Sequence, residues 1–157
     1  MCKNNKQLMH LAINKSKHSV ESGGGPFGAI IVKNGKVIAE ASNSVTQTND
    51  PTAHAEVNAI RLASAKLNSF DLSGCEIYTS CEPCPMCLGA IYWAHIDKIY
   101  YANTKLDAKN IGFDDSFIYS ELELPLDKRK VPAIQIEHNE ALKVFKAWEL
   151  KDDKTEY

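Results

Sequence analysis

The segment at residues 78–90, YTSCEPCPMCLGA, constrains the fold more than any other part of this 157-residue chain. Cys84 precedes Pro85, which biases the cysteine away from the helical region, while the proline itself suits the first position of a helix. The strand-forming run GCEIYTS comes just before. The pattern predicts a strand followed by a helix that has Cys84 as its N-cap. Cys87 then lies one turn into that helix, on the same face as Cys84.

These two thiols have the spacing of half a zinc site. The positive end of the helix dipole favours the thiolate forms of Cys84 and Cys87, and thiolates are the metal-binding forms. Cys81 lies on the other side of Glu82-Pro83, where extended backbone carries its sulfur several ångströms away, so we expect it to have a packing role. Judged from the cysteines alone, two other interpretations of Cys84 and Cys87 are a redox pair and two small buried hydrophobic residues.

The stretch TAHAEVNAI supplies the second half of the site. His54, Cys84 and Cys87 together give three ligands and leave the fourth tetrahedral position of one zinc ion to water. Glu56 is placed to take a proton from that water and pass it to a leaving group. Residues i and i+2 point about 200° apart on a regular helix, so His54 must lie at or before the first turn.

The hydrophobic pattern alternates between strands and helices. Two apolar runs flank Asn34-Gly35, a strong signal for a type I′ hairpin because both residues tolerate positive φ. Residues 105–124 are long enough for a crossover, so a strand near residues 131–137 should run parallel to the one before it. We predict one three-layer α/β/α domain over residues 1–157 with a mixed five-stranded sheet. A polar tail follows a last helix at 139–148.

Composition excludes several classes of function. The net charge is −2 and the chain has two arginines, Arg61 and Arg129, which disfavours binding to nucleic acid. The longest apolar run, residues 86–94, is too short to cross a membrane, and the N-terminus lacks the apolar core of a secretory signal. An odd, tightly clustered set of cysteines is unlike a disulfide framework and favours a reducing compartment, so we expect a cytoplasmic protein.

HxE followed by PCxxC is the signature of zinc-dependent nucleobase deaminases. The stretches GGPFGAIIV, NDPTAHAEVNAI, YTSCEPCPMCLGAIYWA, GFDDSFIY and the terminal EY resemble the small bacterial guanine deaminases over nearly the full chain. The resemblance implies a cytidine-deaminase-like fold, a homodimer, and hydrolysis of guanine to xanthine and ammonia in purine catabolism. Another deaminase acting on cytosine, a nucleoside or adenosine in tRNA is the alternative. A silent zinc scaffold is a third reading, disfavoured because structural zinc usually has a fourth protein ligand.

The resemblance also places residues at the base. Asn43, Ala55 and Asp115 are implied as substrate contacts, with Asp115 as a possible proton relay and Asp114 as its rival. A purine has donors and acceptors that an amide and a carboxylate can match. Taken singly, Asn43 reads as a turn residue near a strand end and Asp115 as a helix cap.

Aromatic residues are candidates for the walls of a flat pocket. Phe27 and Phe113 are favoured over Trp93, which lies six residues past Cys87 and about 120° around the helix. Core packing is an equal alternative for each. Composition alone predicts a frayed tail. The resemblance instead implies that the segment at about 149–157 crosses to the other subunit, where Tyr157 closes the active site.

Overall fold

The computed structural model describes residues 3–157 and divides the chain into two compact units. The first unit ends at Asp115 and the second is Ser116–Tyr157. Each unit is described by itself below.

The first unit is built on a sheet with the strand order β2-β1-β3-β4. The strands are β1 (Gly28–Lys33), β2 (Lys36–Ser42), β3 (Cys75–Cys81) and β4 (Lys98–Asn103). The hairpin prediction is confirmed, since β1 and β2 are antiparallel and the turn residues Asn34 and Gly35 have φ of 51° and 72°. β1 pairs antiparallel with β3, and β3 runs parallel to β4. The chain crosses from β3 to β4 through one helix.

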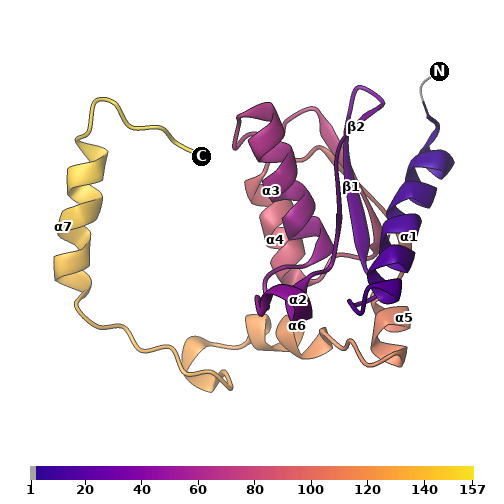
Figure 1. Ribbon diagram of the computed structural model, residues 1–157. Coiled ribbons are helices and arrows are strands. Elements are labelled where there is room, and N and C mark those ends of the chain that lie inside the picture. The colour runs from indigo at the N-terminus through magenta and orange to yellow at the C-terminus, as the bar shows by residue number, and fades with distance from the viewer. Residues whose placement is uncertain (1–2) are drawn as a thin grey trace. The chain divides into compact units, whose positions relative to one another are not determined.

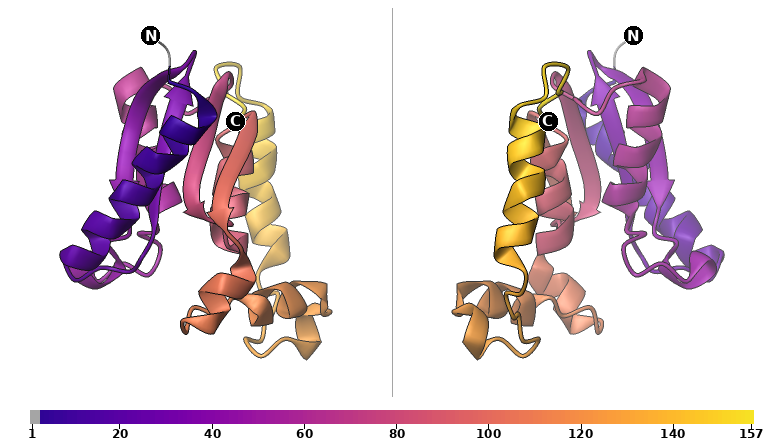
Figure 2. Two further views of the ribbon diagram at one scale, coloured as in Figure 1. Left: turned by 90° about the vertical axis from the view of Figure 1, so that its right-hand side faces the viewer. Right: turned by 90° about the vertical axis from the view of Figure 1, so that its left-hand side faces the viewer.

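Helices cover both faces of this sheet (Figures 1 and 2). They are α1 (Asn5–Glu21) on one face, and α3 (Ala55–Leu67) with α4 (Pro85–Trp93) on the other. Leu8 and Ala12 of α1 pack on Ile30 and Tyr78, while small residues of α3 pack on the opposite side of the same strands. Alternate strand residues therefore feed two separate cores. Short helices α2 (Val45–Thr48) and α5 (Lys105–Asn110) lie in the connections that follow β2 and β4.

The predicted fifth strand is wrong. Residues 131–137 are irregular, and the sheet has four strands. Val131, Ile134 and Ile136 are 78%, 82% and 79% exposed. The alternating pattern is that of a strand, but a strand also needs a partner for its backbone groups. Among the described residues no strand pairs with this segment, so β4 is an edge of the sheet.

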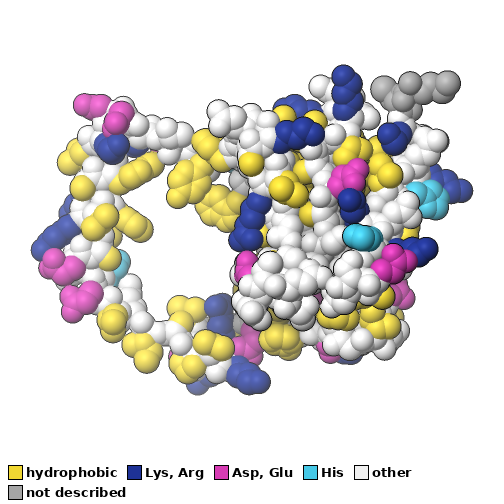
Figure 3. All heavy atoms as spheres, in the orientation of Figure 1, with side chains coloured by type: hydrophobic (Ala, Val, Ile, Leu, Met, Phe, Trp, Pro, Cys, Tyr) yellow, Lys and Arg dark blue, Asp and Glu magenta, His cyan; other side chains and the backbone are white. Residues whose placement is uncertain are grey.

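The second unit contains α6 (Ser116–Glu123), a short 3-10 turn (Leu126–Lys128) and α7 (His138–Glu149). None of these elements contributes a buried residue. Its surface carries many apolar side chains, as the space-filling view in Figure 3 shows. Within residues 3–157 no helix has both the length and the apolarity that crossing a bilayer requires.

Candidate active site

Two helix N-termini place the predicted metal ligands. His54 is the N-cap of α3 with φ −70° and ψ 156°, and Cys84 is the N-cap of α4 with φ −66° and ψ 168°. Pro85 occupies the start of α4, as expected from its fixed φ. His54 has extended backbone and Glu56 is already helical. That difference lets their side chains turn toward the same region although they are only two residues apart.

The structure brings His54, Cys84 and Cys87 together. His54 Nδ1 lies 3.6 Å from Cys84 Sγ and 3.5 Å from Cys87 Sγ. All three potential ligand atoms lie within 4.8 Å of one another. Zinc bonds of about 2.3 Å to sulfur and 2.0 Å to nitrogen, at a tetrahedral angle, separate such atoms by about 3.5 Å. The donor set and its spacing therefore fit zinc.

Cys81 lies outside this cluster, as the position of Pro83 suggested. Its thiol is buried and points toward the carbonyl oxygen of Thr104, with Sγ 3.6 Å from that oxygen. Burial raises the pKa of Cys81 to about 11. A neutral thiol in such surroundings behaves as a small packing group.

The thiols of the cluster differ in charge. A hydrogen bond from Cys87, followed by the interaction with His54, lowers the pKa of Cys84 to about 4. The same bond raises the pKa of Cys87, and burial adds to this shift. The hydrogen bond to Cys84 also raises the pKa of His54. The lowered pKa of Cys84 favours its thiolate, which is the form of cysteine that binds a metal.

Glu56 lies next to the cluster and is 5% exposed. Thr79 Oγ1 donates to Glu56 Oε1 at 2.8 Å, and Cys87 Sγ donates to Oε2 at 3.4 Å. Burial raises the pKa of Glu56 above its usual range, although both of these hydrogen bonds oppose the shift. A raised pKa favours the protonated form of a carboxyl group, which can donate a proton, and its ionised form can accept one.

Sequence reasoning missed Thr79. It lies on β3, on the side that faces α3 and α4, where Cys75 and Ile77 are part of the apolar core. A polar residue on an otherwise apolar face of the strand, five residues before Cys84, was the available signal. It could be recognised only once the facing helix was known.

Two further candidates lie at the ends of elements. Asn43 follows β2, is 7% exposed, and accepts a 3.3 Å hydrogen bond from the backbone nitrogen of Val45 through Oδ1. Its turn-forming role is therefore present in the structure. Its Nδ2 has no acceptor among the described residues. This polar group can meet a ligand.

The two aspartates in GFDDSF have different surroundings. Asp114 forms an ion pair with Lys109 at 3.1 Å, and its side chain is 41% exposed. Asp115 is half-buried, and desolvation raises the pKa of its carboxyl group, with a further contribution from the negative charge of Cys84. The charge of the ligand cluster therefore affects the pKa of Asp115, while Asp114 forms an ion pair with Lys109 at the surface.

Comparisons with known proteins agree with this geometry. Residues 2–103 match the family described as the cytidine and deoxycytidylate deaminase zinc-binding region. The chain belongs to this family of zinc-binding deaminases. It is 50% identical over 155 residues to guanine deaminase from Bacillus subtilis (strain 168), covering 98% of this chain and 99% of that protein.

Two further comparisons show how much of this deaminase each relative matches. The X-ray structure of the Bacillus subtilis guanine deaminase superimposes with a TM-score of 0.96 over 99% of both chains. A tRNA-specific adenosine deaminase from Aquifex aeolicus is 44% identical over 105 residues, which is 67% of this chain and 68% of that protein. The adenosine deaminase thus shares about two thirds of the chain, and the guanine deaminase shares nearly all of it.

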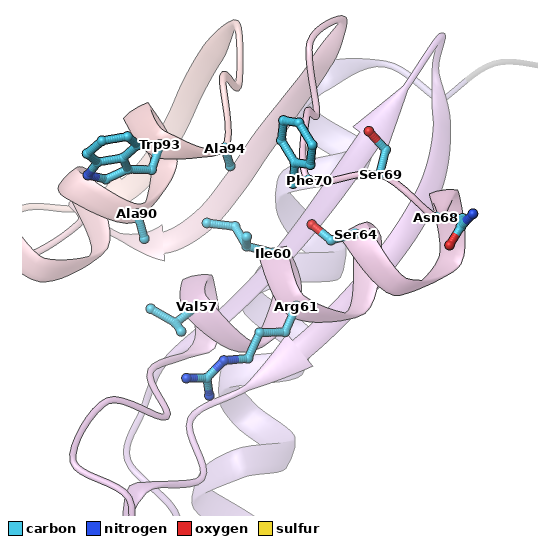
Figure 4. Close-up of a pocket in the computed structure, with 10 residues that line it drawn as sticks. All are labelled: Val57, Ile60, Arg61, Ser64, Asn68, Ser69, Phe70, Ala90, Trp93 and Ala94. Atoms are coloured by element: carbon cyan, nitrogen blue, oxygen red, sulfur yellow. The ribbon is translucent and has the colours of Figure 1, made fainter. Parts of the chain in front are cut away.

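Among the aromatic candidates, Phe27 and Phe113 lie together in this deaminase. Their ring centroids are 4.9 Å apart and the rings are nearly perpendicular, at 88°. Trp93 instead lines a groove between α3 and α4 with Ile60 and Phe70 (Figure 4). Six residues of helix place it about 9 Å along the axis from Cys87. The structure therefore pairs the two phenylalanines and leaves Trp93 on another surface.

Ala55 and Tyr157 complete the predicted set. Ala55 is 0% exposed and packs in the core between α3 and the sheet, so its methyl group does not line a surface. Tyr157 belongs to the second unit and is 75% exposed.

Proposed function

We propose that this deaminase catalyses the zinc-dependent hydrolysis of guanine to xanthine and ammonia, with one zinc ion held by His54, Cys84 and Cys87 of each chain. The observation that carries the proposal is the buried Glu56 beside these three ligand atoms, in a chain half identical to a guanine deaminase over almost its full length. Three protein ligands leave a coordination position for water, as catalytic zinc requires.

The residues of the chain have separate tasks in this reaction. Bound zinc supplies Lewis acidity, which lowers the pKa of water to about 7. Glu56 takes one proton from the attacking water and delivers it to the amino group, which leaves as ammonia as its bond to carbon breaks. The second proton of the water ends on a ring nitrogen of xanthine, and the oxygen of water replaces the amino group of the base. The raised pKa of the buried carboxyl group suits both transfers.

The candidates for the substrate contacts are the polar and aromatic residues described above. We assign Asn43 and Asp115 to the donors and acceptors on the edge of the purine. Phe27 and Phe113 are assigned to the faces of its ring, since aromatic contacts stabilise flat heterocycles. Asp115 is favoured over Asp114, because its carboxyl is half-buried and senses the charge of Cys84.

A free base is favoured over an RNA substrate. The net charge is −2 and arginine occurs twice, whereas RNA binding relies on cationic surfaces and arginine contacts. The likeness to the tRNA-specific enzyme covers 67% of this chain, whereas the likeness to the guanine deaminase covers 98% of it. Cytosine and purine nucleosides are the remaining alternatives.

An ammonia-release assay on guanine, adenine, cytosine, guanosine and a tRNA anticodon stem tests the assignment. We expect activity on guanine. Glu56→Gln should keep zinc and bind guanine but lose about 10²- to 10⁴-fold in kcat, because the amide cannot carry the proton. Glu21→Gln, at the exposed end of α1, is the matched control. Release of ammonia from cytosine alone, or full activity of Glu56→Gln, contradicts the proposal.

We infer in addition that the enzyme is a homodimer in which the segment at about 149–157 crosses to the other subunit, so that Tyr157 covers the base. Two facts support this inference: the second unit has no buried residue in its helices, and Tyr157 is 75% exposed. A lid that excludes water strengthens electrostatic catalysis in the site that it covers. An exchanged segment also provides a low-cost route to a dimer.

A mixing experiment tests the exchange. A chain lacking Tyr157 is combined with a Glu56→Gln chain, and heterodimers are isolated. One of the two sites then has its own Glu56 and receives Tyr157 from its partner, so part of the activity should return. Verified heterodimers without recovery contradict the exchange.

A cytoplasmic location and a role in purine catabolism complete the proposal. The four cysteines among the described residues are free thiols, which supports a reducing compartment. Retention of all activity in a cytosolic cell fraction is the expected result.

A further inference from the structure

The side chain of Thr79 is an exception on its face of β3. Residues alternate between the two faces of a strand, so Cys75, Ile77, Thr79 and Cys81 point toward α3 and α4. The other three are apolar or weakly polar and buried, and Thr79 is 1% exposed. Valine has nearly the same shape and suits a strand equally well. The strand therefore gives no reason for a hydroxyl group at this position.

The hydroxyl group has one specific partner. Thr79 Oγ1 donates to Glu56 Oε1 at 2.8 Å, a common length for a well-formed O–H···O hydrogen bond. The other carboxyl oxygen, Oε2, lies 3.4 Å from Cys87 Sγ. The two oxygens of Glu56 are thus distinguished: Oε1 is turned toward the sheet and Oε2 toward the ligand cluster.

When a metal is bound, Thr79 still donates a hydrogen bond to Glu56, whereas Cys87 does not. As a zinc ligand Cys87 is a thiolate, which has no proton to donate to Glu56. Threonine is stiff at χ1, and the β3 backbone is paired on both sides with β1 and β4. The hydroxyl group is therefore held at a fixed position by the sheet, 23 residues away in sequence from the carboxyl group that it contacts.

We propose that Thr79 is a positioning residue for Glu56. Its hydroxyl group holds Oε1 against β3 so that Oε2 faces the reacting water and the amino group of the base. The assignment rests on the proposed role of Glu56 and extends it to a residue outside the HxE and PCxxC motifs. It predicts that the hydroxyl group matters for turnover and has little effect on the affinity for guanine or on metal binding.

Thr79→Val tests this in the full-length, zinc-loaded enzyme, because valine keeps the shape and removes the hydrogen bond. We expect kcat for guanine to fall about 10- to 100-fold, with KM within about twofold. Thr79→Ser keeps the hydroxyl group and should retain kcat within about threefold. Zinc content should stay at one per chain in both variants. A purely structural role would not separate kcat from KM or distinguish the two substitutions in this way.

A double-mutant cycle adds a second readout. In the Glu56→Gln background Thr79→Val should cost less than about twofold in residual activity, since the group that it positions is already disabled. Ile77→Val is the matched control: Ile77 lies on the same face of β3, and the change removes one methylene from a side chain that has no hydrogen-bonding group. It should lower the midpoint of urea unfolding and leave kcat unchanged.

Wild-type kcat in a zinc-loaded Thr79→Val enzyme overturns the inference, as does a kcat loss that is equally large in the Glu56→Gln background. If Thr79→Val does not fold or loses zinc, Thr79→Ala and Thr79→Ser replace it, because both lack the methyl group and only serine keeps the hydroxyl. Equal kcat for that pair overturns the inference. Failure of the proposed function is distinct, since then the wild-type enzyme releases no ammonia from guanine or Glu56→Gln is fully active.

Discussion

The two units of the chain differ in how they use apolar residues. In the first unit Ile30, Ile31 and Tyr78 are fully buried between the sheet and its helices. In the second unit Ile134 and Phe145 are 82% and 73% exposed, and no helix has a buried residue. Many exposed large apolar side chains in one segment favour contact with another surface. The first unit therefore contains both a core and the ligand cluster, while the second has the composition of a segment that another surface covers.

The lack of buried apolar side chains has a large effect on the stability of a segment of this size. Burying one isoleucine or phenylalanine side chain contributes about 1.5–3 kcal/mol, and ordering each residue costs about 1–2 kcal/mol in backbone entropy. Within its own boundaries, the second unit gains little stabilisation from the burial of apolar side chains. In the proposed exchange between subunits, a second copy of the chain supplies a surface on which these side chains are buried.

The largest effect expected for the chemistry of the first unit comes from the metal ligands. Cys84→Ala should lose zinc and reduce deamination by more than about 10³-fold, because the remaining two ligands do not hold a catalytic zinc. Cys81→Ala, three residues away, should keep one zinc per chain. Elemental analysis of the purified variants, together with ammonia release, measures both results. Loss of zinc in Cys81→Ala, with zinc retained in Cys84→Ala, would mean that Cys81 and not Cys84 is the metal ligand.

Removing residues 116–157 tests the division directly. A chain that ends at Asp115 should fold and bind zinc, because both cores and all three ligands lie before that point. Its activity should fall about 100-fold or more, since the residues proposed to cover the base are gone. Circular dichroism, zinc content and ammonia release are the measurements. An unfolded or metal-free product would show that the first unit depends on the second for its fold.

The aspartates next to the boundary provide a smaller and more local test. Asp115→Ala should reduce kcat/KM for guanine about 10- to 100-fold, because a buried donor of the base loses its acceptor. Asp114→Ala removes an exposed ion pair with Lys109 and should change it less than about threefold. Each variant serves as the control for the other. Equal losses would mean that the difference in burial does not decide which carboxylate binds the base.

Local features of the chain could be predicted from the sequence, whereas features that depend on contacts between distant segments could not. Local backbone sterics fixed the hairpin at Asn34-Gly35 and the N-cap at Cys84, and the structure has both. Pairing is not local, so the alternating pattern at residues 131–137 predicted a strand that has no partner among the described residues. Thr79 was missed for the same reason, since its role depends on which helix packs over β3.

The smallest expected effect comes from the removal of one methylene group from an isoleucine in each unit. Ile31→Val should lower the free energy of unfolding by about 0.5–1.5 kcal/mol at any protein concentration, because Ile31 is 0% exposed. Ile134→Val makes the same chemical change at a side chain that is 82% exposed, so in dilute protein it should cost less than about 0.5 kcal/mol. Where dimers form, the proposed exchange adds a cost that grows with concentration, because apolar contacts between chains stabilise by mass action.

Urea unfolding of both variants across a wide range of protein concentration measures this difference. A cost for Ile134→Val that equals that of Ile31→Val and does not change with concentration would mean that residues 131–137 are covered by their own chain. The contrast between the two units would then disappear, and with it the support that the exposed surface of the second unit gives to exchange between subunits. A cost that rises with concentration would place Ile134 in the contact between chains.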